Sequence, residues 1–291
     1  MKRSLLFILI FIAAITAMGQ SRKKPANFNK NAGKKDKFLE KQWWLGFKAG
    51  VNLTGANPIN RYTVLTPTNY AVSLNDKAYD NFSKLGSQAS LEATFYYKGF
   101  SFSFQPTYRH VRFTYSNEFN WDNPENVTEE LVLNYDHEQK IDYADFPLAV
   151  KYDLTGNRLR PYVQLGVFYS RLINANKSVK VSGQDFASGG TNEFSNEPVI
   201  VGAKDLFNKS YWGFTGGVGL NYNLGNVRLI LDVSYQLGMS NITNTKNRFG
   251  NDRLSGIGDV PDDLKINNIV ISTGVLFPMR FLSNSFKTLD H

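Results

Sequence analysis

Eight stretches of the chain alternate apolar and polar residues with a period of two, the pattern of β-strands that have one apolar face. In the clearest stretch, residues 89–97, the odd-numbered positions are apolar. Residues 100–104 then place phenylalanine at every second position, and only Lys98 and Gly99 separate the two stretches. Two alternating stretches joined by two residues predict a β-hairpin.

The joints between the stretches alternate between short and long. Three tight turns are separated by four long polar joints, at about residues 54–84, 116–138, 174–209 and 241–265. In the third stretch the apolar positions change parity at Val111, which predicts a bulge or a strand that protrudes above the membrane. The sequence predicts an all-β fold: an eight-stranded antiparallel up-and-down transmembrane β-barrel with four long extracellular loops and short periplasmic turns.

Periodicity alone leaves open whether the apolar faces meet lipid or fill a soluble, lipocalin-like barrel. Aromatic residues near the ends of the apolar faces favour lipid, because they resemble interfacial girdles. We assign to these girdles Trp44, Tyr97, Tyr108, Tyr152, Tyr169, Tyr222 and Tyr235. We also expect the adjacent pair Trp43 and Trp44 to anchor the first strand at the inner interface.

Charge and hydropathy divide the chain into four parts. We expect residues 1–19 to be a signal peptide, because two basic residues precede an apolar run that is too short to span a bilayer. Residues 20–42 hold eight basic and two acidic residues, a net charge of +6, and predict a basic, flexible periplasmic leader. Residues 43–280 would form the barrel, and residues 281–291 a short C-terminal tail.

The barrel is neutral overall, because the signal and the leader together account for the formal charge of +8. A neutral barrel gives no reason to expect nucleic-acid binding. We expect the leader to bind a protein partner, or else to be a solvated linker. Its candidate contact residues are Arg22, Lys23, Lys24, Lys34, Lys35 and Lys37. The chain has no cysteine, which excludes disulfides, thiol metal sites and a lipid-attachment cysteine.

Four charged residues fall on the polar faces of the strands: Lys48, Glu92, Lys151 and Asp232. Side chains fill the interior of an eight-stranded barrel, so buried charges there must pair. We therefore predict a lumenal polar network that plugs the interior. A narrow small-solute channel is the alternative.

Candidate catalytic and metal-binding residues are few. His110 and His137 lie where strands three and four are expected to leave the membrane, and a catalytic role would need serine and carboxylate neighbours. We interpret both histidines as ordinary rim polarity. Asp252, Asp259, Asp262 and Asp263 could bind calcium, but their spacing fits no loop motif, and a solvated acidic loop is the preferred interpretation. We predict no catalytic site, cofactor or metal.

Several short motifs carry a family resemblance. They are Asp-Phe-Pro-Leu-Ala-Val-Lys-Tyr at 145–152, Arg-Pro-Tyr-Val-Gln-Leu-Gly at 160–166, Gly-Val-Gly-Leu at 217–220 and Tyr-Gln-Leu-Gly-Met-Ser-Asn-Ile at 235–242. They resemble the PorT-like outer-membrane barrels of Bacteroidota. The resemblance implies a barrel in the outer membrane of a Gram-negative bacterium, with both termini periplasmic and with partners in type IX secretion or gliding.

These observations predict a non-enzymatic interaction or accessory component of the envelope. Its expected partners are outer-membrane lipid and proteins bound by the leader or the extracellular loops. A narrow channel and a lipid-modifying outer-membrane enzyme remain the alternatives.

Overall fold

The computed structural model describes residues 41–62, 76–126, 128–155, 158–187, 190–224, 227–255 and 259–279. Its strands are β1 (Lys41–Asn60), β2 (Ala78–Asp80), β3 (Leu85–Tyr97), β4 (Phe100–Phe104), β5 (Thr107–Asp122), β6 (Glu130–Asp153), β7 (Leu159–Asp185), β8 (Asn192–Ser195), β9 (Val199–Gly202), β10 (Ser210–Asn223), β11 (Arg228–Gly238) and β12 (Asp263–Pro278). Three short helices lie between them: η3 (Lys204–Leu206), η4 (Thr245–Asn247) and α2 (Asp252–Ser255).

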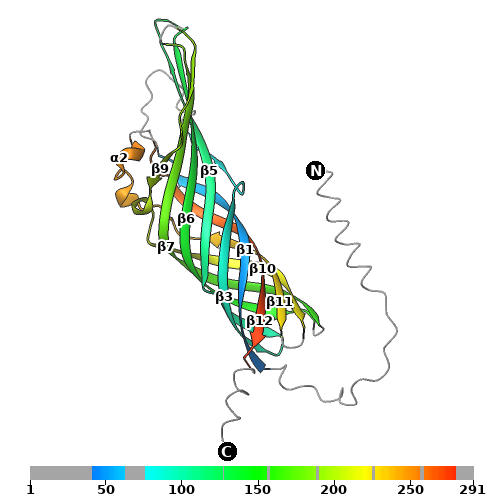
Figure 1. Ribbon diagram of the computed structural model, residues 1–291. Coiled ribbons are helices and arrows are strands. Elements are labelled where there is room, and N and C mark those ends of the chain that lie inside the picture. Colours follow the sequence, from blue (N-terminus) through cyan, green and yellow to red (C-terminus); the bar gives the residue numbers. More distant parts are fainter. Residues whose placement is uncertain are drawn as a thin grey trace, which may run out of the picture. The chain divides into compact units, whose positions relative to one another are not determined.

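The strands close into a ring of eight antiparallel members (Figure 1). Its order is β1, β3, β4 continued by β5, β6, β7, β10, β11 and β12, and β12 pairs back with β1. Closure pairs the first and last strands and leaves no open edge at barrel level. The predicted eight-stranded all-β fold is confirmed.

The hairpin of β3 and β4 has the predicted two-residue turn. Tyr97 pairs with Phe100, and the intervening Lys98 and Gly99 have φ angles of 46° and 94°. Positive φ at both central positions defines the turn type whose twist matches the flanking strands, and glycine adopts it without steric cost.

The apolar faces of the strands point outward at barrel level. Leu165 on β7 is 73% exposed, and exposed apolar residues recur at alternate positions on every strand of the ring. Most inward-facing positions at the same level are polar or charged. The surface is therefore a belt that a bilayer would cover, opposite to the facing of a soluble barrel. Among the described residues, no helix is long and apolar enough to cross a membrane.

Of the two alternatives predicted for the parity change on β5, the bulge is absent, and the strand instead continues beyond the barrel to Asp122. β4 and β5 keep one register with β3 and one with β6 across the break at Pro106. Val111 and Phe113 face inward, as Thr107 and Arg109 do. What changes is the interior itself, because the polar lumen gives way beyond Arg109 to an apolar core that includes Val111, Phe113, Ile141 and Tyr143.

Two of the four predicted long loops are mostly strand. Residues 116–138 extend β5 and β6 and leave only 123–129 as a connection, while 174–209 extend β7 and contain β8 and β9. Polar turn residues concealed this extension, because strands that stand in water on one face carry asparagine and acidic residues as loops do. The extended parts of β5, β6 and β7, together with β8, form a sheet beyond the barrel, which we call the arm (Figure 1).

Candidate functional site

The four charged residues predicted for the lumen meet in the interior of the barrel. Lys48 Nζ lies 2.9 Å from Glu92 Oε2 and 2.7 Å from Asp232 Oδ2, and Lys151 Nζ lies 2.6 Å from Glu92 Oε1. All four side chains are buried. Two cations and two anions from β1, β3, β6 and β11 thus compensate one another across the lumen.

Neutral groups complete this network. Thr94 and Ser103 donate hydrogen bonds to Glu92 Oε1 at 2.8 and 2.9 Å, and Lys48 donates to Gln105 Oε1 at 2.8 Å. A cavity of about 30 Å³ remains beside Lys48, room for only one or two water molecules. Side chains therefore fill the barrel at this level.

Toward the tight-turn end, a second layer of side chains lies inside the barrel. Trp44 belongs to this layer and therefore does not have the interfacial role expected of it. Trp43 is 54% exposed on the outer face and packs on Phe95, with ring centroids 5.0 Å apart. Trp44 is only 3% exposed and lies inside, with the guanidinium of Arg228 4.1 Å from its ring centroid. Strict alternation along β1 allows only one of two adjacent residues to face lipid, so Trp44 cannot be an interfacial anchor and only Trp43 faces outward.

Toward the arm, Arg109 marks the transition from polar lumen to apolar core. Its Nη2 lies 2.8 Å from Asp145 Oδ2 and donates to the Tyr211 hydroxyl at 2.7 Å. The Phe168 ring stacks on the same guanidinium. Arg109 is completely buried, and this pairing keeps its charge compensated.

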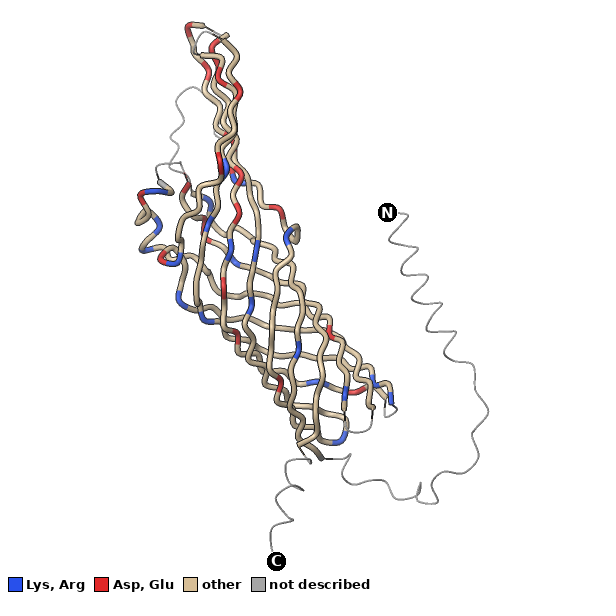
Figure 2. The backbone as a smooth tube through the Cα atoms, viewed as in Figure 1, with Lys and Arg blue, Asp and Glu red and all other residues tan. Residues whose placement is uncertain are grey.

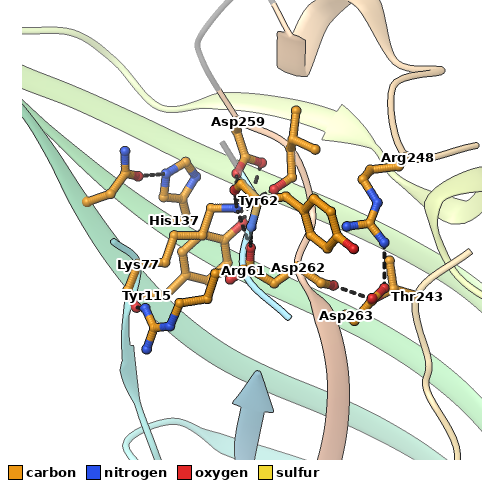
Figure 3. A network of polar contacts seen from close by, with 12 residues as sticks. Arg61, Tyr62, Lys77, Tyr115, His137, Thr243, Arg248, Asp259, Asp262 and Asp263 are labelled. Carbon is orange, nitrogen blue, oxygen red and sulfur yellow. Dashed lines mark hydrogen bonds and ion pairs between the residues drawn. The ribbon is translucent and has the colours of Figure 1, made fainter. Parts of the chain in front are cut away.

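Beyond the apolar core, connecting segments are tied to the strands by a second ionic cluster, which we call the cap network (Figure 3). Lys77 Nζ lies 3.6 Å from Asp259 Oδ1 and 3.2 Å from Asp262 Oδ1, and Lys177 on β7 pairs with Asp259. The Tyr115 hydroxyl also donates to Asp259. The cluster therefore joins the segment before β12, the segment before β2, and the strands β5 and β7.

The cap network corrects the expectation of a solvated acidic loop. Asp259, Asp262 and Asp263 are buried, and Asp263 pairs with Arg248, whose guanidinium lies over the Tyr62 ring. The nearby cations already compensate these carboxylates. Asp252 lies apart, exposed on α2. In the ranges that the structure describes, no three histidine or carboxylate side chains are arranged to hold a metal ion.

His137 is not a rim residue but part of this cap. It stacks on Tyr115 with ring centroids 4.4 Å apart. Its Nε2 lies 2.8 Å from Oδ1 of the Asn117 side chain, which accepts, so Nε2 donates. Burial lowers the pKa of His137 to about 3. Burial alone would raise the pKa of Asp259, but Lys177 and Lys77 hold it below its ordinary value. Asp259 is therefore ionised and His137 neutral at neutral pH.

His110 lies on the outer face of β5, immediately beyond the apolar belt. Its Nδ1 lies 2.6 Å from Asp142 Oδ1 on β6, and the Tyr108 hydroxyl donates to the same oxygen at 2.9 Å. Directly opposite His110 on β3 is Ser87. Sequence reasoning missed both partners, because Ser87 and Asp142 are far from His110 in the chain and only the strand register brings the three together.

The leader residues Arg22, Lys23, Lys24, Lys34, Lys35 and Lys37, the signal segment and the C-terminal tail lie outside the described residues.

Comparison with known proteins identifies a family. The profile of the family described as outer membrane protein beta-barrel domain matches residues 19–244. A search of curated proteins finds no match. Among solved structures, the chain is similar to the attachment invasion locus protein Ail of Yersinia pestis in complex with the heparin analogue sucrose octasulfate, at 10% identity, covering 81% of this chain and 99% of Ail, with a TM-score of 0.31.

Two other solved structures are also similar to the chain. Neisserial surface protein A is 17% identical, with 81% of this chain and 96% of that chain covered and a TM-score of 0.30. The outer membrane protease OmpT of Escherichia coli is 8% identical, with 82% and 95% covered and a TM-score of 0.27.

Proposed function

Because the chain belongs to the outer membrane protein beta-barrel domain family, we propose that it is an outer-membrane barrel that acts by binding partners, as an interaction or accessory component of the cell envelope. The observation that carries this proposal is the filled lumen. Lys48, Glu92, Lys151 and Asp232 compensate one another across the interior, and about 30 Å³ remains beside them. A solute pathway would have to break these ion pairs, so the proposal assigns function to the surfaces outside the membrane.

The arm is the first such surface. Residues 116–136 and 178–198 contain nine acidic residues and one basic residue, Lys180. The acidic residues are Glu118, Asp122, Glu125, Glu129, Glu130, Asp136, Asp185, Glu193 and Glu197, and Figure 2 shows acidic residues gathered along the arm. A surface with one sign of charge steers oppositely charged partners toward itself.

The basic leader is the second surface. With a net charge of +6 in residues 20–42, it suits an acidic partner on the tight-turn side, which we place in the periplasm together with both termini. The motifs at 145–152 and 160–166, with their resemblance to PorT-like proteins, support a place in the type IX secretion or gliding apparatus of a Bacteroidota envelope.

Co-purification tests this proposal. The full-length protein, cross-linked in native outer membranes and then solubilised, should retain one or more envelope proteins in stoichiometric amounts. A barrel that carries only lipid after cross-linking would contradict a binding function. Recovery of partners outside the type IX apparatus would contradict the PorT-like assignment.

A further inference from the structure

A hydroxyl, an imidazole and a carboxylate lie side by side on three neighbouring strands at the outer face of the barrel. Ser87 on β3 is directly opposite His110 on β5, and His110 is directly opposite Asp142 on β6. Ser87 is exposed, and the side chains of His110 and Asp142 are 30% and 19% exposed. This is the composition and the order of a nucleophile, a base and the group that orients the base.

The imidazole and the carboxylate already have the geometry of a catalytic pair. His110 Nδ1 lies 2.6 Å from Asp142 Oδ1, and because a carboxylate accepts, Nδ1 carries the proton. Nε2 is then the free basic nitrogen. The Tyr108 hydroxyl also donates to Asp142 Oδ1, at 2.9 Å, and holds the carboxylate in place.

Ser87 is held next to this pair by the backbone. Directly opposed residues of antiparallel strands have Cβ atoms about 4.5–5.5 Å apart. From inside the barrel, Asn52 Nδ2 donates to the Ser87 carbonyl at 3.3 Å and to the His110 carbonyl at 3.1 Å. One buried amide thus bridges the two strands at this row. The bond from the hydroxyl to His110 would form by side-chain rotation, as catalytic hydrogen bonds often tighten only when substrate binds.

The surroundings of Ser87 are those of a site for acyl chains. Leu85 and Ala89 flank it on β3, and Val51 lies directly opposite it on β1. All three are exposed on the outer face and belong to the apolar belt. An acyl chain packed along the belt would therefore bring its ester group to Ser87.

The side of His110 away from the belt carries two cations. Arg112, two residues along β5, and Lys140, opposite Arg112 on β6, both pair with Glu138. Their side chains are 34% and 39% exposed, so both can turn toward a lipid phosphate beside the barrel.

We propose that Ser87, His110 and Asp142 form a hydrolytic site for acyl esters of phosphate-bearing lipids in the surrounding leaflet, with Arg112 and Lys140 contacting the phosphate. Ser87 Oγ attacks the ester carbonyl carbon and gives its proton to His110 Nε2. The bond between the carbonyl carbon and the alkoxy oxygen of the ester breaks, and His110 returns the proton to the departing alkoxide. Water then gives a proton to His110 Nε2 and its hydroxide to the acyl carbon. The bond between the acyl carbon and Ser87 Oγ breaks, and His110 returns the proton to Ser87 Oγ as the fatty acid leaves.

This inference goes beyond the binding function and departs from the prediction that the protein is not an enzyme. That prediction weighed His110 without its neighbours. The two roles use different surfaces, because the site lies at the edge of the belt whereas the proposed partner surfaces are the arm and the leader.

Two measurements on the folded, detergent-purified full-length protein test the site. A fluorophosphonate probe should label Ser87, and mass spectrometry should detect fatty acid released from phosphatidylethanolamine or lipid A but not from triacylglycerol. Release from only one of the two phosphate-bearing lipids would identify that lipid as the substrate. Equal release from triacylglycerol would overturn the role of Arg112 and Lys140. Asp142→Asn should lower the release rate by about a thousandfold or more, because the imidazole loses its orienting carboxylate.

Matched variants separate catalysis from folding. Ser87→Ala should abolish labelling and release, whereas Ser116→Ala, another outer-face serine on β5, should retain both. Boiled and unboiled samples run on gels confirm that each variant is a folded barrel. Absence of labelling and release in the folded wild-type protein, or release that persists in Ser87→Ala, would overturn the site. Ser87→Ala should still co-purify with envelope partners, so failure of the site leaves the binding function standing.

Discussion

Lys48 and Asp232 are 184 positions apart in the chain, yet the ammonium of one lies 2.7 Å from the carboxylate of the other inside the barrel. The pair links β1 to β11, strands that are separated in the ring only by β12. Because both groups are buried, either one alone would be an uncompensated charge in the interior. The pair can therefore form only when the ring has closed, and it reports closure directly.

Removing one charge of this pair should lower the free energy of unfolding more than removing both. Lys48→Met leaves Asp232 buried without its cation and should destabilise the barrel by about 3–5 kcal/mol. Lys48→Met combined with Asp232→Asn should recover a large part of that loss, since the stranded charge is gone. Urea unfolding in detergent micelles, arranged as a double-mutant cycle, measures the coupling. If the losses in Lys48→Met and in Asp232→Asn simply added up to the loss in the double variant, the coupling would be zero and the two groups would not interact.

The facing of the strands predicts opposite responses to charge. Leu231→Arg or Leu148→Arg puts a cation on the outer belt and should cost about 2–4 kcal/mol near the bilayer midplane. Gln164→Glu should be better tolerated than either arginine variant, because Gln164 is buried inside and lies directly opposite the cation Lys151. Folding yield into lipid vesicles compares the three variants. If Gln164→Glu failed to fold while the arginine variants folded, the inner and outer faces would be exchanged.

The sequence predicted the belt and the lumenal charges well, because strand periodicity acts over a few residues. It misplaced Trp44, whose inward facing follows from the same alternation that puts Leu45 and Phe47 outside. It also read residues 116–138 as a loop. There most inward positions are apolar and most outward ones polar, the reverse of the membrane segments, because water replaces lipid around the arm.

The contacts of the cap network and of the row at Ser87 could not be predicted from the sequence. Lys77, Lys177 and Asp259 come from three connections or strand extensions whose lengths and paths periodicity does not determine. Ser87, His110 and Asp142 depend on the register of three strands, and a shift by one residue would move Ser87 to the other face. Only the structure could show which side chains these registers place together.

Acidification should loosen the cap network before it affects the barrel. The pKa of His137 is about 3 in the folded protein and 6.5 ordinarily, so the unfolded cap binds the proton more tightly. The stabilisation by neutral His137 is complete above pH 6.5 and is lost as the pH falls toward 3; protonation of Asp259 adds to the loss below its ordinary pKa of 3.8.

Hydrogen exchange measured at a series of pH values checks this. Amides near Tyr115 and His137 should lose protection below pH 6.5 in the wild-type protein, while β11 stays protected and serves as an internal control. His137→Gln, which has no titrating ring, should keep its protection down to about pH 4, where the carboxylates begin to titrate. Identical profiles for the wild-type protein and His137→Gln would rule out this role of His137.

The leader should serve binding and not folding. Deleting residues 22–37 should leave unfolding in urea unchanged, because terminal segments contribute little to stability. The same deletion should weaken recovery of a periplasmic partner, and added salt should weaken recovery by the full-length protein, as expected for exposed charges. Native pull-downs at low and high salt compare the two proteins. The same partners at both salt concentrations would reduce the leader to a linker.

If the lumen is closed, as its ion pairs indicate, the protein can act only through its surfaces. Single-channel recording of the purified full-length protein in planar bilayers tests this most directly. Because Lys48, Glu92, Lys151 and Asp232 compensate one another across a filled interior, we expect no conductance steps above those of protein-free bilayers at moderate voltage. Reproducible, ion-selective steps that change in size in a Lys48→Met variant would contradict the claim and identify the lumen as a channel.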